Sequence, residues 1–107
     1  MGSKTPFRLI YHPNFVDHLK WIDSKYHAEI REVIEQQLAY DANTETRNRK
    51  PLKRPLPFDA RWELRFGPNN RFRVFYSVDE GNHLVSIVAL GEKDHERIKI
   101  AGEELKS

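Results

Sequence analysis

A β-hairpin pattern in the middle of the chain constrains the fold most strongly. Large apolar side chains alternate with polar ones in the two runs 61–66 and 71–78, and Gly67-Pro68-Asn69-Asn70 between them is a strong turn signal. This alternation is typical of antiparallel strands that bury one face and expose the other. The nearly continuous apolar run from Leu84 to Leu90 predicts a third strand, covered on both faces, which ends at Gly91.

The register of the hairpin follows from its apolar faces. Phe66 must oppose Phe72, because a slip of one residue would turn every apolar side chain outward. Arg65 then lies opposite Arg73 on the other face, where like charges destabilise a sheet by up to about 1 kcal/mol. Such a pair is tolerated when an anion or a carboxylate lies between the guanidiniums. We therefore expect Glu63, on the same face, either to orient one guanidinium or to act as a base.

The residues before the hairpin predict one strand and two helices. Residues 6–12 are rich enough in β-branched and aromatic side chains for a short strand that ends at Pro13, and Asn14 is the expected N-cap of the next helix. Apolar side chains then recur at helical spacing over 15–25 and again over 27–40, which predicts an amphipathic helical hairpin.

The order of these elements predicts an α+β fold. The helical hairpin should pack on one face of an antiparallel meander, and the other face should carry the arginines. Trp21 and Trp62 are expected to lie in the core. The charged C-terminal segment 92–107 should form a short helix or a docked arm. At 107 residues the chain is expected to be a single domain, 1–107, in which residues 1–5 are flexible or left over from cloning.

Basic charge is segregated in this chain. The window Arg47–Arg73 holds nine basic and two acidic side chains, although the net charge of the whole chain is only +2. Prolines favour an ordered loop or extended segment over 41–58, pinned by Leu52, Leu56 and Phe58. Guanidiniums concentrated on a rigid sheet face suit the binding of a phosphate backbone. The alternative is a solvated hairpin face whose arginine stems cover apolar surface.

Composition argues against several classes of protein. The chain has no cysteine, which rules out disulfides and thiolate zinc sites and fits a reducing cytoplasm. Its histidines lack metal-ligand spacing, so we expect no metal. The chain contains no apolar run of the roughly 20 residues that span a membrane, so we expect no membrane contact.

One histidine, His95, differs from the others in its position. It follows the third strand of the meander, where a loop could return toward the basic face. A histidine beside Lys93 and near a bound phosphate could serve as a general acid or base. A surface histidine without such a role is an equally good interpretation.

These motifs together resemble the RelE/ParE superfamily of bacterial toxins from type II toxin–antitoxin pairs. The resemblance covers about residues 7–102 and rests on the order of the elements and on three motifs. These are Lys50-Pro51-Leu52-Lys53, the hairpin block from Trp62 to Tyr76, and Gly91-Glu92-Lys93. The resemblance implies a RelE-like fold, an antitoxin partner and no cofactor. For the RelE-like branch it also implies cleavage of messenger RNA on the ribosome, without a metal, to leave a 2′,3′-cyclic phosphate.

The resemblance also implies roles for single residues. Arg73 matches the family's strand arginine that stabilises transition-state charge, and Arg65 lies beside it. No tyrosine follows Tyr76, so His95 is the available group where the family often has a tyrosine or histidine. Catalytic roles are thus expected for Arg73, Arg65 and His95, and also for Glu63 because of its place on the same face. RNA-binding roles are expected for Arg47, Arg49, Lys50, Lys53, Arg54, Arg61, Arg71 and Lys93.

Two other functions stay open at this point. A ParE-like member shares the fold but inhibits DNA gyrase without nuclease residues, and a basic RNA-binding module would have no toxicity. Activity that survives replacement of Arg73 and His95 would favour a mechanism other than RNA cleavage. A steep salt dependence of binding to naked RNA would favour the module.

Overall fold

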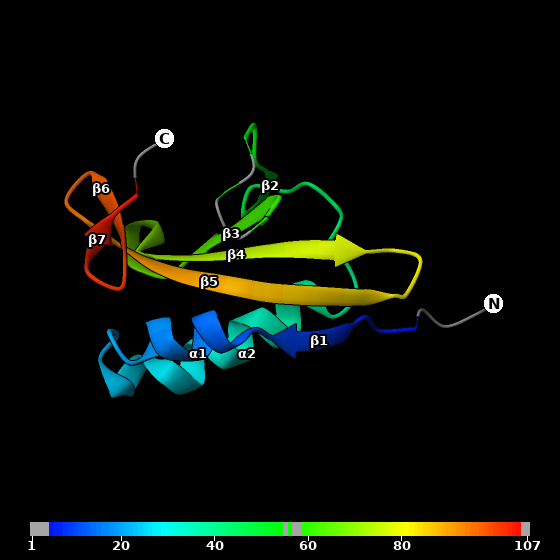
Figure 1. Cartoon of the computed structure of the whole chain (residues 1–107), viewed down its shortest axis with the longest axis horizontal. Helices are drawn as coiled ribbons and strands as arrows, with labels where there is room; N and C mark the ends of the chain where they lie inside the picture. The colour runs from blue at the N-terminus through cyan, green and yellow to red at the C-terminus, as the bar shows by residue number, and fades with distance from the viewer. Residues whose placement is uncertain (1–4, 55, 57–58, 106–107) are drawn as a thin grey trace.

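A computed structural model describes residues 5–54, 56 and 59–105, which form a curved sheet with two helices packed on one face (Figure 1). The elements are β1 (Arg8–Tyr11), α1 (Pro13–Leu19), the 3-10 helix η1 (Ser24–Tyr26), α2 (His27–Leu38), β2 (Arg49–Pro51), β3 (Trp62–Phe66), the 3-10 helix η2 (Pro68–Asn70), β4 (Phe72–Asp79), β5 (Leu84–Asp94), β6 (Arg97–Ile100) and β7 (Glu103–Glu104). The α+β architecture predicted from the sequence is confirmed. Residues 1–4 of the expected flexible start lie outside the described part of the chain.

The sheet has the strand order β2-β3-β4-β5-β6-β7, and β1 pairs in parallel with β5. Within it, β3 and β4 have the predicted register, with Phe66 opposite Phe72 and Arg65 opposite Arg73. At the edges of the sheet, β2 and β3 on one side and β6 and β7 on the other rise away from the helices (Figure 1). The helices thus cover the convex face, and the edges of the sheet border a concave face.

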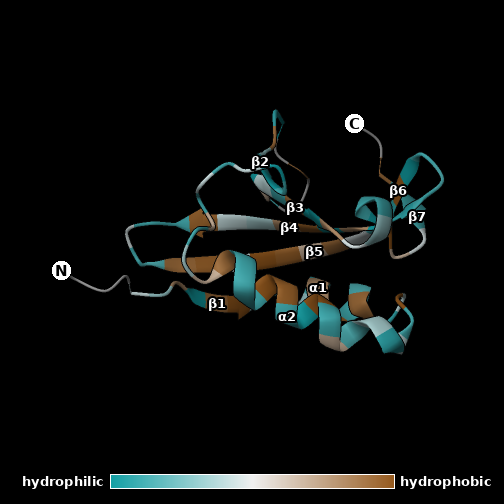
Figure 2. Cartoon of the chain, turned by 180° about the vertical axis from the view of Figure 1, so that it is seen from behind, coloured by the Kyte–Doolittle hydropathy of each residue, from teal (hydrophilic) through white to brown (hydrophobic). Residues whose placement is uncertain are grey.

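The main core lies between the helices and the convex face. Each helix turns its apolar stripe toward the sheet, as the hydropathy colouring in Figure 2 shows. The fully buried aliphatic side chains of this core are Ile30, Ile34, Leu38, Leu64, Val74, Val85, Ile87 and Leu90. Trp62, also expected in the core, is half-buried at its margin, and Leu19 packs there as well. No helix in the described ranges is long and apolar enough to cross a membrane.

The first helix differs from its predicted bounds of 15–25. It begins at Pro13, whose fixed φ suits a first helical turn. Its N-cap is His12, whose Nδ1 accepts a hydrogen bond from the Asn14 backbone N–H at 3.1 Å, so the N-cap prediction for Asn14 was wrong. Because the helix ends at Leu19, the residues after it no longer follow the apolar face of the helix. The Trp21 side chain is therefore 64% exposed. The prediction that Trp21 lies in the core was therefore wrong.

The C-terminal segment also differs from expectation. Strand β5 continues through Gly91 to Asp94 rather than ending at Gly91, and the tail forms β6 and β7, so no short helix is found over the described residues 92–105. A Cβ atom on Gly91 would lie 3.0 Å from Ile98 Cγ2 and 3.2 Å from the Lys99 carbonyl oxygen. The glycine therefore permits β6 to pack closely across β5. Of the two alternatives, the docked arm was the correct one.

The concave face is only partly an arginine face. A second buried cluster covers its middle and consists of Ala60, Phe75, Val88, Ala89 and Ile100. A β-bulge contributes to this cluster, because Phe75 pairs with Ala89 and Tyr76 with Ile87, which leaves Val88 as an extra residue. Leu52 and Leu56 pack against the cluster, whereas Phe58 lies outside the described residues. The arginines occupy the end of this face next to η2.

Candidate functional site

Three charged side chains meet at the η2 end of the concave face. Glu63 and Arg65 lie two residues apart on β3 and so share a face, and Arg73 on β4 is paired with Arg65. The Nε of Arg65 donates to Oε1 of Glu63, and Nη1 of Arg73 donates to the same oxygen at 3.2 Å. The Nε of Arg73 donates to the Asn70 carbonyl at 3.2 Å. One carboxylate oxygen therefore joins the two opposed guanidiniums, and we call this group the Glu63 triad.

The members of the Glu63 triad differ in exposure. The side chains of Glu63 and Arg73 are 9% and 11% exposed, whereas that of Arg65 is 39% exposed. Burial lowers the pKa of the Arg73 guanidinium, the Glu63 carboxylate raises it, and Arg65 lowers it again. An arginine nevertheless stays protonated in proteins, so the triad carries two positive charges against one negative. The surplus charge is available to an anion, and Arg65 is the member that solvent reaches most easily.

Other basic residues lie around the triad at the surface. Lys50 on β2 is paired with Glu63 across the sheet, and its Nζ lies 3.7 Å from Oε2 of Glu45. The Nη2 atom of Arg61 lies 3.7 Å from Oδ1 of Asp59. Exposed positions in the segments before and after β2 are occupied by Arg47, Lys53 and Arg54. These residues widen the positive surface beyond the triad.

Arg49 lies elsewhere, although it belongs to the same basic window of the sequence. It is 8% exposed, and in β2 it is paired with Leu64, whose side chain belongs to the core under the helices. Its Nε donates to the Thr44 carbonyl at 3.0 Å, and its Nη1 donates to the Gln37 carbonyl at 3.1 Å. These bonds tie β2 to the end of α2. Its environment therefore suits a structural role better than contact with RNA.

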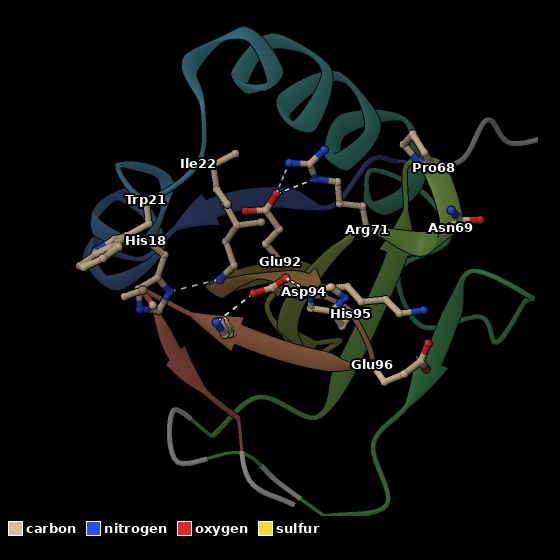
Figure 3. Close-up of a pocket in the computed structure, with 15 residues that line it drawn as sticks. His18, Trp21, Ile22, Pro68, Asn69, Arg71, Glu92, Asp94, His95 and Glu96 are labelled. Carbon is tan, nitrogen blue, oxygen red and sulfur yellow. Dashed lines mark hydrogen bonds and ion pairs between the residues drawn. The ribbon is translucent and has the colours of Figure 1, made fainter.

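The remaining predicted site residues line a groove at the start of β4 and the end of β5 (Figure 3). Arg71 Nε donates to Glu92 Oε2 at 2.6 Å, its Nη1 donates to the Tyr26 hydroxyl at 3.2 Å, and its guanidinium lies 4.8 Å from the Tyr26 ring centroid. Lys93 and His95 line the same groove. The His95 side chain is 94% exposed in the β5–β6 turn, where its Nε2 lies 3.7 Å from Asp94. The predicted residues thus fall into two groups, the triad and the groove.

Sequence reasoning gave no role to a second histidine at this groove. His18 is 8% exposed, and its Nδ1 accepts the backbone N–H of Leu90 at 3.2 Å. Burial lowers its pKa, and the smaller effect of Asp17 raises it. Its helical position gives no hint of this contact, because the partner lies 72 residues away in the sequence. Across the ranges that the structure describes, no three His, Asp or Glu side chains lie close enough to hold a metal ion.

Comparison with known proteins adds to this geometry. No protein-family model matches the sequence, and no curated protein matches it. Among solved structures, a chain of the toxin–antitoxin complex RelBE2 from Mycobacterium tuberculosis superposes with a TM-score of 0.67 and 19% identity, covering 82% of this chain and 99% of that one. A chain of the archaeal RelE–RelB complex from Pyrococcus horikoshii gives 0.61 and 19%, covering 83% and 97%. The predicted RelE-like fold is therefore confirmed.

Proposed function

We propose, from the fold shared with chains of these RelE–RelB complexes, that this protein is the toxin of a type II toxin–antitoxin pair. We further propose that the whole chain acts as one domain and cleaves messenger RNA on the ribosome, without a metal or cofactor. The observation that carries this proposal is the Glu63 triad, because two guanidiniums meet on the concave face beside an extended basic surface. A phosphate group of RNA has the charge and the acceptor oxygens that this arrangement can bind.

The proposed reaction is an internal displacement at phosphorus. The RNA 2′-oxygen forms a bond to the neighbouring phosphorus, and the bond from phosphorus to the 5′-oxygen breaks. The products are a 2′,3′-cyclic phosphate and a free 5′-hydroxyl. Negative charge grows on the phosphate oxygens in the transition state, and guanidiniums that are already in place stabilise it without reorganisation. In this proposal Arg65 and Arg73 supply that stabilisation.

The Glu63 carboxylate receives a positioning role in this proposal. Its Oε1 already accepts hydrogen bonds from both arginines, so it holds their forks in place rather than acting as the base. His95, whose side chain is 94% exposed on the β5–β6 turn, is assigned the proton transfer to the departing 5′-oxygen, and the proton of the attacking 2′-hydroxyl passes to solvent water. General acid–base catalysis typically contributes a factor of about 100 to 10,000, so the reaction needs this group as well as the arginines.

The proposal includes a partner protein. Each of the two similar structures is a complex with a second protein. The one from Mycobacterium tuberculosis is described as a toxin–antitoxin complex. We infer an acidic, partly disordered antitoxin that folds onto the sheet or displaces the C-terminal arm, since acidic side chains would cover the basic surface. The proposed site of action is the cytoplasm, where ribosomes and messages are found.

One observation favours a second candidate function, inhibition of DNA gyrase without RNA cleavage. The Arg73 guanidinium is 11% exposed and already bonded to Glu63 and to the Asn70 carbonyl, so a substrate would have to compete for it. In addition, no tyrosine follows Tyr76 to replace His95 in proton transfer. A toxin that works by binding alone would need neither group.

The deciding experiment is toeprinting of messenger RNA on programmed ribosomes. The wild-type protein should cut the message, and Arg65→Lys should cut it far more slowly. Arg31→Lys is the matched control, because this exposed arginine pairs with Glu35 on α2 at the helical face. Induced expression should stop translation without a change in DNA supercoiling. An intact message in cells that stop dividing, together with altered supercoiling, would replace the nuclease proposal by the gyrase proposal.

A further inference from the structure

The groove beside the Glu63 triad contains an aromatic side chain, Trp21, that the proposed reaction does not use. It is bounded by the end of α1 and by η2, β5 and the β5–β6 turn, and its volume is about 840 Å³. Figure 3 shows Trp21 and His18 on one side, Pro68 and Asn69 on another, and Arg71 with Glu92 between them. This volume lies within the roughly 300–1,000 Å³ typical of sites for small ligands.

Trp21 forms an aromatic wall of this groove. Its side chain is 64% exposed, yet its six-membered ring lies against the backbone of Gly102. A Cβ atom on Gly102 would lie 3.0 Å from Trp21 Cζ3, and the residue has a φ of +80°, so glycine suits this position for two reasons. The backbone of Gly102 therefore supports the indole while most of the side chain stays open to solvent. A ring held in this way is a ready stacking surface.

The charges of the groove leave one cation available. Arg71 is paired with Glu92 at 2.6 Å, and Lys99 is paired with Asp94 at 2.9 Å. Lys93 makes no ion pair within the described part of the chain. It is also close to the triad, because its backbone N–H donates to the carbonyl of Arg71, which lies two residues before Arg73, at 2.7 Å. The groove thus combines an aromatic platform, an available ammonium and proximity to the triad.

We infer that this groove holds one nucleotide of single-stranded RNA, with the base stacked on Trp21 and its phosphate at Lys93. This inference rests on the proposed function, since the RNA that runs past Arg65 and Arg73 would continue over the start of β4 into the groove. Aromatic side chains accept any base, because every base has a π face, so the subsite would add affinity rather than sequence preference. A peptide of the antitoxin is the competing occupant.

Tryptophan fluorescence tests this inference without any need for cleavage. The chain has two tryptophans, so a Trp62→Phe protein reports on Trp21 alone. A short oligoadenylate should quench the emission of Trp21, whereas inorganic polyphosphate, which has charge but no base, should not. Equal quenching by both probes, or by neither, would overturn the stacking model.

Binding measurements provide the second test. Trp21→Ala should weaken oligoadenylate binding by about 5- to 100-fold, the range typical of a lost base stack. Trp21→Phe should keep most of the oligoadenylate binding of wild type, which separates the loss of stacking from a folding defect. Tyr40→Ala is the matched control, since Tyr40 is an exposed aromatic residue outside the groove. Binding by Trp21→Ala within twofold of wild type would overturn the inference, and so would quenching by an antitoxin peptide but not by RNA.

The outcomes separate the inference from the proposed function. Wild-type cleavage of ribosome-bound messages combined with no Trp21 quenching would reject the groove and leave the nuclease proposal intact. Trp21-dependent RNA binding by a protein that cuts no message would support the groove and reject the nuclease proposal.

Discussion

Arg65 and Arg73 face each other across β3 and β4, and both donate a hydrogen bond to the same oxygen of Glu63. The opposition of like charges in a sheet is thus compensated within the protein. The compensation is incomplete, because one carboxylate meets two guanidiniums.

Replacement of the carboxylate should destabilise the protein. Glu63→Gln leaves two neighbouring guanidiniums, one of them buried, without a counter-charge, and breaking a buried pair in this way typically costs about 3 kcal/mol or more. Urea denaturation should therefore show a clearly lower midpoint. Glu96→Gln, at an exposed carboxylate, should change stability by no more than about 0.5 kcal/mol. Equal midpoints for the two variants would mean that Glu63 does not stabilise the triad.

Arg65 offers a cleaner test of catalysis than the buried Arg73. Its side chain is 39% exposed, so Arg65→Lys should fold normally, but a lysine cannot reproduce the planar fork of an arginine. Loss of one preorganised donor typically slows a reaction about 100- to 1000-fold. Single-turnover cleavage of a message on programmed ribosomes measures this change. A rate within threefold of wild type would remove Arg65 from the catalytic group.

His95→Ala should slow cleavage without a change in stability. The side chain is 94% exposed, so its loss removes little packing, while water can replace only part of a positioned proton donor. We expect a decrease in cleavage rate of about 100-fold, at the lower end for general acid–base catalysis. His83→Ala serves as the control, because this histidine lies in the β4–β5 turn and bonds the Thr5 carbonyl. Equal rates for both variants would reject the assignment of His95.

His18 should make stability depend on pH. Burial lowers its pKa in the folded protein, so the folded state binds fewer protons than the unfolded state near and below the ordinary histidine value of about 6.5. The corresponding stability is complete above that value and is lost as the pH falls. Thermal melts of wild type at pH 7.5 and 5.5 should differ more than those of His18→Gln, in which an amide can accept the Leu90 N–H. Identical pH dependence would contradict this role.

Gly91→Ala should loosen the C-terminal strands. A methyl group would press on Ile98 and on the backbone of β6, and such overpacking typically costs about 1–3 kcal/mol. Gly81→Ala is the matched control, because a Cβ there would meet only Asp79 Oδ1, at an ordinary 3.5 Å. Chemical denaturation of both proteins gives the comparison. Similar midpoints would show that β6 adjusts without cost.

Local patterns predicted the parts of this fold in which neighbours in sequence decide the outcome. Period-two alternation predicted the hairpin and its register, so the opposition of Arg65 and Arg73 was predicted from the sequence. Helical spacing predicted α2 within a few residues. The short alternation of Arg97, Ile98, Lys99 and Ile100 was also a strand signal, but the charged residues around it concealed β6.

Contacts between residues that are distant in the sequence decided where the other side chains of the site lie. Arg49 and Arg65 belong to one basic window, yet the first reaches the end of α2 and the second reaches Glu63, because adjoining strands place them on opposite faces. Trp21 lies against Gly102, and His18 accepts a bond from Leu90, both across most of the chain. The sequence alone determined which side chains share a face of the hairpin and of α2. Only the tertiary structure decided what covers each face, since that depends on how distant segments bury their surface together.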